Sequence, residues 1–327
     1  MASPKTMIQT VHLAQQYIDA PAVVDDAKSM QQPDGQSTVT VWYHAEGGAA
    51  KAGFREAPVE GTVLGALVVQ ALLRDPATRA GALLLVNGGQ GNFSFTITRP
   101  MYAGDRIRVD ASADASFRTA SVSLVRPAPV QGRVGSPHQK KDWLCVRSAF
   151  GFDPAVLLLP EPRPGDFPRT PLPAYGRRHA CAAASLWAGR RLGSLAFTAD
   201  RAFHRRLIAE DYAAADLLDL FADDGGVHPS LFLEYANKFV RFNFNVEASM
   251  GWLHLGSRVQ FFGAASVGEP LVMHGRVKRA FRDYLGGDAA VFDLAVCSER
   301  RRGVCICRIE NFQLLDLHHP EKFASQL

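Results

Sequence analysis

An internal repeat is the feature of this sequence that most restricts how the chain can fold. An apolar helix, a strand, a turn of the form x-Gly-acid and a second strand occur twice in the same order. The turn is Gly104-Asp105 in the first half and Gly268-Glu269 in the second, 164 residues later. A repeat of that length corresponds to a whole domain and not to one unit of a solenoid. The sequence therefore predicts two copies of one domain that form an internal pseudo-dimer.

Each copy contains a helix that we expect to be buried. Residues 61–73, GTVLGALVVQALL, are apolar on nearly every side, and Asp75-Pro76 ends this helix because proline cannot continue it. In the second copy, residues 229–242 begin with proline at a first helical position and carry apolar side chains at helical spacing. The small residues Gly61 and Gly65 would let strands or a ligand approach the backbone of the first helix closely.

Strands are expected around both helices, which predicts an α+β fold with antiparallel sheets. In the first copy, β-forming patterns occupy residues 37–43, 83–87, 93–98, 107–109 and 119–125. In the second copy, residues 192–198 are expected as the first strand, 202–220 as mostly helical, and further strands begin near residue 252, with a hairpin over 290–298 and 304–315.

A proline-rich segment separates the two copies. Residues 160–173, PEPRPGDFPRTPLP, contain six prolines in fourteen residues, which is typical of a stiff, extended linker. We therefore divide the chain into a first domain over residues 1–150, a linker over 151–178 and a second domain over 179–327.

Length and charge restrict the classes of partner. The 327 residues suffice for two domains, and the hydrophobic share of 47% is typical of a globular protein. The net charge is only +4, and the single basic run, residues 300–302, lies at the hairpin turn, so we expect no nucleic-acid partner. No stretch approaches the roughly 18 apolar residues of a membrane span, so we expect no membrane partner.

The cysteines and the N-terminus indicate a cytoplasmic protein. The five cysteines form no Cys-x-x-Cys pair and their number is odd, so we expect neither a disulfide framework nor a zinc site, and no other metal. The N-terminal residues lack the apolar core of a signal peptide.

Four short motifs of the second copy carry a resemblance to a known family. They are His228-Pro229, Ala236-Asn237, residues 252–257 (WLHLGS) and residues 267–269 (VGE). Through these four motifs the sequence resembles the second half of MaoC-like acyl dehydratases and (R)-specific enoyl-CoA hydratases. The resemblance covers roughly residues 40–125 and 185–315. It implies two tandem hotdog domains, each an antiparallel sheet wrapped around a central helix.

The resemblance also implies a chemistry. Family members hydrate an enoyl thioester with a loop motif Asp-x-Asn-Pro-x-His, whose carboxylate and imidazole hold one water and move its proton. A backbone N–H at the start of the central helix polarises the thioester carbonyl. By resemblance, Gly61 in the first copy and Ser230 in the second are the candidate donors, and Gly65 is a candidate substrate-binding residue.

Both copies depart from the catalytic motif. In the first copy the resemblance places His44 at the histidine position, whereas Val39 stands at the aspartate position. In the second copy Asp216 stands at the aspartate position and Phe221 at the histidine position. Each copy keeps half of the pair. A loop histidine without a special role and a solvated helix aspartate are the alternative interpretations of His44 and Asp216.

Two further residues are candidate catalytic groups. Glu234 lies on the second helix, where some hotdog dehydratases and thioesterases place a catalytic carboxylate, although its spacing from Pro229 is one residue short of the dehydratase pattern. His254 begins a strand and could line the cleft. An exposed helix charge and a strand histidine paired with a neighbour are the alternatives.

We therefore expect a hydro-lyase that adds water to, or removes it from, an acyl thioester. The implied partner is an acyl-CoA or an acyl carrier protein thioester, and a homodimer is left open. No cofactor is expected, because CoA or the pantetheine of the carrier belongs to the substrate. Two alternatives stay open: a hotdog thioesterase that uses Glu234 or Asp216, and a protein that binds acyl thioesters without catalysis.

Overall fold

The computed structural model describes most of the chain. The described residues are 5–10, 54, 56, 58–86, 90–114, 116, 118–128, 141–163, 165–221, 226–245, 253–284 and 287–317. The strand predicted over 37–43 and the candidate residue His44 lie outside them.

The described strands form one long sheet and one short strand pair. They are β1 (Lys5–Thr10), β2 (Gly91–Ile97), β3 (Arg106–Ala113), β4 (Thr119–Arg126), β5 (Trp143–Gly151), β6 (His179–Ala180), β7 (Arg191–Thr198), β8 (Phe244–Asn245), β9 (Leu253–Phe261), β10 (Pro270–Tyr284), β11 (Gly287–Ser298) and β12 (Val304–Leu317). Ten of them make a sheet in the order β1-β3-β4-β5-β2-β9-β12-β11-β10-β7, in which all neighbours are antiparallel, and β6 pairs with β8.

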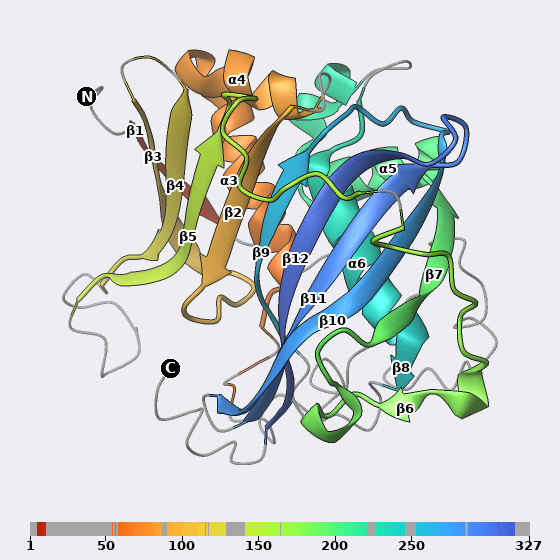
Figure 1. Cartoon of the computed structure of the whole chain (residues 1–327). Coiled ribbons are helices and arrows are strands. Elements are labelled where there is room, and N and C mark those ends of the chain that lie inside the picture. Colours follow the sequence, from red (N-terminus) through yellow and green to blue (C-terminus); the bar gives the residue numbers. More distant parts are fainter. Residues whose placement is uncertain are drawn as a thin grey trace.

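The two copies join within this sheet. The strands of the first copy occupy one end and those of the second copy the other, and β2 pairs with β9 from Gly91↔Phe261 to Thr96↔Gly256. We call this boundary the β2–β9 seam. Since each half is an antiparallel sheet with its own long helix, the predicted α+β pseudo-dimer is confirmed (Figure 1).

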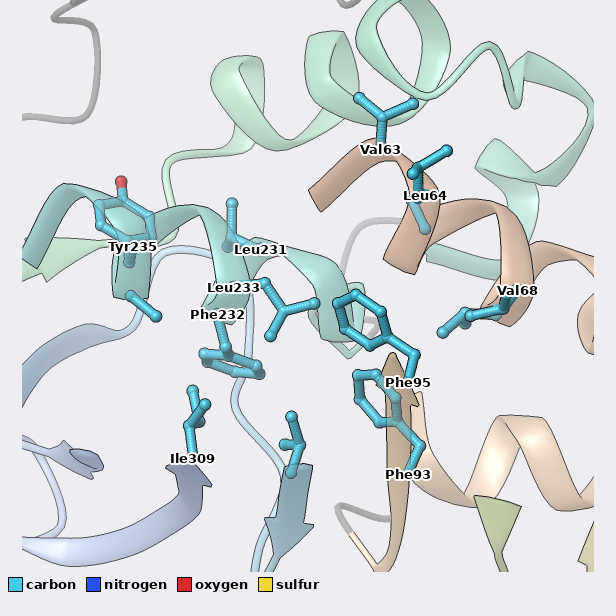
Figure 2. Packing of buried hydrophobic residues seen from close by; sticks show 14 of the residues in the cluster. Val63, Leu64, Val68, Phe93, Phe95, Leu231, Phe232, Leu233, Tyr235 and Ile309 are labelled. Atoms are coloured by element: carbon cyan, nitrogen blue, oxygen red, sulfur yellow. The ribbon is translucent and has the colours of Figure 1, made fainter. Parts of the chain in front are cut away.

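The helices that were predicted to be central are both buried. Helix α3 (Gly61–Arg74) is buried from Gly61 to Leu73, and α6 (Pro229–Asn243) is buried at all but one position. Both lie on the same face of the sheet and pack against each other (Figure 1). Figure 2 shows apolar side chains of α3, α6, β2 and β12 meeting in one core, with Leu233 and Phe95 adjacent.

The repeated turn has the same geometry in both halves. Gly104 has φ 81° and Gly268 has φ 82°, values that favour glycine. The acid that follows binds back to the turn: a carboxylate oxygen of Asp105 accepts from the Tyr102 N–H at 3.0 Å, and one of Glu269 accepts from the Ser266 N–H at 3.0 Å. The acid therefore fixes the turn in each copy, which explains why the sequence repeats it.

The linker crosses the face of the sheet opposite the helices (Figure 1). Its backbone is tied to both halves, because Asn92 of β2 donates to the Val156 carbonyl at 3.0 Å and the Leu158 N–H donates to Gln260 of β9 at 2.7 Å. Strand β5 ends at Gly151, one residue into the predicted linker.

Two predicted elements differ from the structure. The strand expected over 83–87 is wrong for residues 83–86, which belong to α4 (Pro76–Val86). Ala82, Leu85 and Val86 are buried there while Leu84 is 45% exposed, a helical spacing that a short apolar run does not reveal. The helix expected over 202–220 is divided into α5 (Arg201–Arg206), the π-helix η5 (Leu207–Asp211) and the 3₁₀ helix η6 (Ala215–Phe221). Two further 3₁₀ turns are η3 (Tyr175–Arg177) and η4 (Ala183–Ser185).

Candidate active site

Helix α3 begins at Gly61 with a first turn that no side chain caps within the described part of the chain. Its N-cap residue, Glu60, has extended backbone angles (φ −61°, ψ 141°) and makes no capping hydrogen bond with its side chain. The first backbone N–H groups of a helix have no partner inside the helix, and the helix dipole places partial positive charge there. This end of α3 is therefore suited to hold a carbonyl oxygen or an anion.

A cavity of about 80 Å³ lies at this end of α3. Both copies line it, because α3 and β2 come from the first half and β9 comes from the second. The lining residues are Phe54, Pro58, Val59, Glu60, Gly61, Leu64, Ile97, Thr98, Arg99, Pro100, Leu253, His254 and Leu255. The cavity is thus mostly apolar, with one imidazole, one carboxyl and one guanidinium group, the composition expected of a small-molecule site.

Gly61 and His254 are in direct contact across the two halves. A Cβ added to Gly61 would lie 2.7 Å from Cβ of His254 and 2.8 Å from its Nδ1. Only a residue without a side chain lets the imidazole approach the helix start this closely. The ring also packs edge-on against Phe95, with centroids 5.3 Å apart.

The hydrogen bonds of His254 determine its tautomer. Nε2 lies 3.1 Å from the carbonyl oxygen of Gly256 and 2.8 Å from Oγ of Ser257. Because a carbonyl can only accept, the proton of the neutral ring is on Nε2. Nδ1 is buried and has no hydrogen-bond partner among the described residues, so it presents a lone pair. Burial lowers the pKa of His254 to about 4, against the raising effect of the bond to Gly256, which keeps the imidazole neutral near pH 7.

Two charged residues of the cavity escaped the sequence analysis. Glu60 directly precedes Gly61, and its position beside the predicted donor was the only available signal. Arg99 follows β2, and its guanidinium stacks 4.8 Å from the ring centroid of Trp143. Arg126 stacks on the same ring at 4.7 Å and pairs with Asp105 at 3.2 Å. These contacts tie Arg99 to the repeated turn.

Comparison with known proteins bears on the fold. No protein-family model and no curated protein sequence matches this chain. A structure described as a MaoC-like dehydratase is similar over 97% of this chain and 98% of its own, with 13% identity and a TM-score of 0.52. A conserved hypothetical protein of Mycobacterium tuberculosis, described as having a double hotdog fold, matches over 96% of both chains with 12% identity and a TM-score of 0.53. A putative MaoC domain dehydratase from Chloroflexus aurantiacus J-10-fl has 9% identity, a TM-score of 0.51 and coverage of 97% and 96%.

The chain has a double hotdog fold. At these identities the similarity establishes the fold alone, and the predicted tandem hotdog architecture is confirmed.

The second hotdog does not offer an equivalent site at the start of α6. The Ser230 N–H, predicted as an alternative donor, already donates to Nδ1 of His228 at 3.2 Å. The N–H of His228 donates to Nε2 of His204 at 3.0 Å, and both imidazoles are buried against Phe221. Burial lowers the pKa of His204 to about 4; burial, with a smaller contribution from His204, lowers that of His228 to about 3. Side chains of the protein itself therefore occupy this helix terminus.

Among the described residues, the predicted site residues Asp216, Glu234 and Gly65 do not line the cavity. Asp216 is an exposed carboxylate that pairs with Arg74 at 2.7 Å, and this bond lowers the pKa of Asp216. Glu234 is buried on α6. A Cβ on Gly65 would lie 3.0 Å from Leu233 and 3.2 Å from Phe95, so side chains fill the space that we expected a ligand to use. His44 falls outside the described residues, so its role stays a prediction.

Two structural properties bear on partners and metals. Within the described residues, no helix is both long and apolar enough to cross a membrane. Across the same part of the chain, no three histidine, cysteine, aspartate or glutamate side chains are grouped as a metal site would require.

Proposed function

We propose that this double hotdog protein acts on an acyl thioester at the start of α3, and that it adds water reversibly to a 2-enoyl thioester. The observation that carries the proposal is the position of the His254 Nδ1 lone pair against Gly61, at an uncapped helix terminus that lines a cavity. A neutral base beside a backbone oxyanion donor is the pair of functions that this reaction needs.

The thioester carbonyl oxygen accepts hydrogen bonds from the first N–H groups of α3, beginning with Gly61. Nδ1 of His254 takes a proton from water while the water oxygen bonds to C3 of the enoyl group. The π electrons of the C2–C3 bond move toward the carbonyl, and α3 stabilises the resulting enolate oxygen. The imidazolium then returns its proton to C2. One water is thereby added across the double bond, and no redox cofactor takes part.

Glu60 supplies the second contact to the water in this proposal. Its carboxylate accepts a hydrogen bond from the O–H group of the water that stays intact, which orients the water oxygen toward C3. Glu60 and His254 together would do what the aspartate and histidine of one loop do in the family that the sequence resembles. The implied substrate is an acyl-CoA or an acyl carrier protein thioester, with the pantetheine as part of the substrate.

The two hotdogs contribute unequally. The first supplies the helix and Glu60, and the second supplies His254 from β9. Because His228 caps α6 and His204 is buried behind it, we expect one active site per chain.

The test is a panel of 2-enoyl-CoA and saturated acyl-CoA esters with purified protein. Loss of the enoyl absorbance without free thiol supports hydration. Release of free thiol supports a thioesterase instead, and binding without either change supports an acyl-binding protein. His254→Gln should lower kcat by roughly 10²-fold or more. The matched control is His179→Gln, because His179 is an exposed histidine outside the cavity. Equal activity of the two variants would remove His254 from the mechanism.

A further inference from the structure

A chain of buried polar groups extends from His254 to helix α6. Nε2 of His254 contacts Oγ of Ser257 at 2.8 Å, and this hydroxyl contacts Oδ1 of Asn311 on β12 at 3.5 Å. Nδ2 of Asn311 donates to Oδ1 of Asn237 on α6 at 3.2 Å. Nε2 of Gln313 donates to both amide oxygens, at 2.9 Å to Asn311 and 2.8 Å to Asn237. Ser257, Asn311 and Gln313 are at most 4% exposed, in a core that is otherwise largely apolar.

The amide orientations in the structure set the direction of these hydrogen bonds. The Gly256 carbonyl accepts from Nε2 of His254, which makes Nε2 the donor to Ser257 as well. The Ser257 hydroxyl, having accepted, donates to Oδ1 of Asn311. Rotating the Asn311 amide would place its nitrogen against the Gln313 nitrogen and its oxygen against the Asn237 oxygen. Rotating this amide alone would therefore break the network, and the bond to the Gly256 carbonyl requires the imidazole tautomer with its proton on Nε2.

We infer that Ser257 and Asn311 are positioning residues that hold His254 with its proton on Nε2 and its Nδ1 lone pair toward the start of α3. The inference deepens the proposed function and rests on it, because it assigns Nδ1 as the atom that takes the proton from water. Neither residue belongs to the stretches that the resemblance aligns with the catalytic loop motif Asp-x-Asn-Pro-x-His. Burying this many polar groups is costly unless they are bonded; among the described residues, Oε1 of Gln313 and Nδ1 of His254 are the network's side-chain atoms that are buried without a hydrogen-bond partner.

The effect of a new charge on the pKa of His254 depends on the charged groups that already surround the imidazole. Glu60 and Arg99 line the same cavity, while the residues of β12 and α6 in the network, Asn311, Gln313 and Asn237, are neutral. Changing Asn311 to Asp keeps an oxygen for the Ser257 hydroxyl and adds a negative charge behind it. A carboxylate separated from Nε2 only by the Ser257 hydroxyl favours the imidazolium and raises the pKa of His254.

The first test measures the ring directly and needs no turnover. Protein labelled with ¹⁵N-histidine is titrated by NMR, and the His254 signals are assigned by their loss in His254→Gln. We expect the Nε2–H tautomer in the wild type. Asn311→Asp should raise the pKa of His254 by about 1 unit or more. The matched control is Asn243→Asp, a buried asparagine of α6 that bonds to Gly193 and lies outside the network.

The second test uses catalysis and covers the case in which a buried carboxylate prevents folding. Ser257→Ala should lower kcat about tenfold with KM within roughly twofold, and Ser257→Thr, which keeps the hydroxyl, should restore most of it. An Nδ1–H tautomer in the wild type, or a pKa change in Asn311→Asp no larger than in Asn243→Asp, overturns the inference. Absence of hydratase activity overturns the proposed function and the assigned proton transfer, while the NMR result still decides whether Ser257 and Asn311 position the ring.

Discussion

Gly61 of the first hotdog and His254 of the second meet so closely that a methyl group on Gly61 would lie 2.8 Å from Nδ1. The contact brings a helix terminus and a neutral base together from segments nearly two hundred residues apart. It depends on the β2–β9 seam, because that pairing places the start of β9 beside α3.

Replacing Gly61 with Ala should abolish hydratase activity while the fold is retained. The added methyl group meets Cβ and the ring of His254, which has to move away from the helix terminus. We expect a loss in kcat/KM of roughly 10²-fold or more, as for removal of an oxyanion donor or a base. Steady-state kinetics measure it, with Gly176→Ala as the control because a methyl group there meets nothing within 4 Å. Wild-type kinetics in Gly61→Ala would show that the contact is not used.

Replacing Gly65 with Leu should destabilise the protein. The space beside Gly65 is filled by Leu233 and Phe95, so the larger side chain overpacks the interface between α3 and α6. We expect the free energy of unfolding to fall by roughly 1–3 kcal/mol, and less for Gly65→Ala. Denaturant titration measures both variants. An unchanged midpoint for Gly65→Leu would mean that the two helices separate easily.

Acid should destabilise the fold before the carboxylates titrate. The pKa of His204 is about 4 and that of His228 about 3 in the folded state, both below the usual 6.5, so the unfolded chain takes up protons first. Stability is complete above pH 6.5 and is lost as the pH falls toward these folded values. We expect each of the two histidines to contribute a loss on the order of 2 kcal/mol between pH 7 and 4.5, measured by denaturant titration. The slope should be smaller in His204→Asn, and an equal slope would assign the loss to other groups.

We expect the carboxylate of Glu60 to contribute to catalysis and the carboxylate of Asp216 to contribute little. Glu60→Gln keeps the size of the side chain but removes its charge in the cavity, and should lower kcat by roughly 10-fold to 100-fold. Asp216→Asn makes the same chemical change at an exposed ion pair with Arg74 and should leave kcat within about twofold and stability within about 1 kcal/mol. The test is to measure kcat of the two variants in parallel. Equal effects would contradict the assignment of Glu60.

His44 is tested by the same assay. If the family motif operates through its histidine, His44→Ala lowers hydratase activity by at least about 10²-fold with acyl-CoA affinity nearly unchanged. If His254 is the base, His44→Ala keeps activity within roughly threefold while His254→Gln loses it. A large loss in both variants would mean that the two imidazoles act together.

Much of the architecture was predictable from local patterns. The turns at Gly104 and Gly268, the helix that begins at Pro229 and the hairpin around residues 300–302 follow from backbone preferences and periodicity. Backbone preference and periodicity each depend on a few neighbouring residues. The repeated order of helix, strand, x-Gly-acid turn and strand showed that the domain is duplicated. One exception, at residues 83–86, is a short apolar run, for which strand and helix patterns coincide.

The candidate site depended on tertiary structure. By sequence, Gly61 was a potential oxyanion donor and His254 one of two candidate histidines, and nothing local placed them together. Their contact, the buried network behind His254 and the capping of α6 by His228 arise from strand register and helix packing between distant segments. The two helices, their sheets and their duplication are encoded by short-range periodicity. Which helix terminus stays open to a ligand depends on the distant side chain that packs against it, and that side chain is set by the packing of the whole fold.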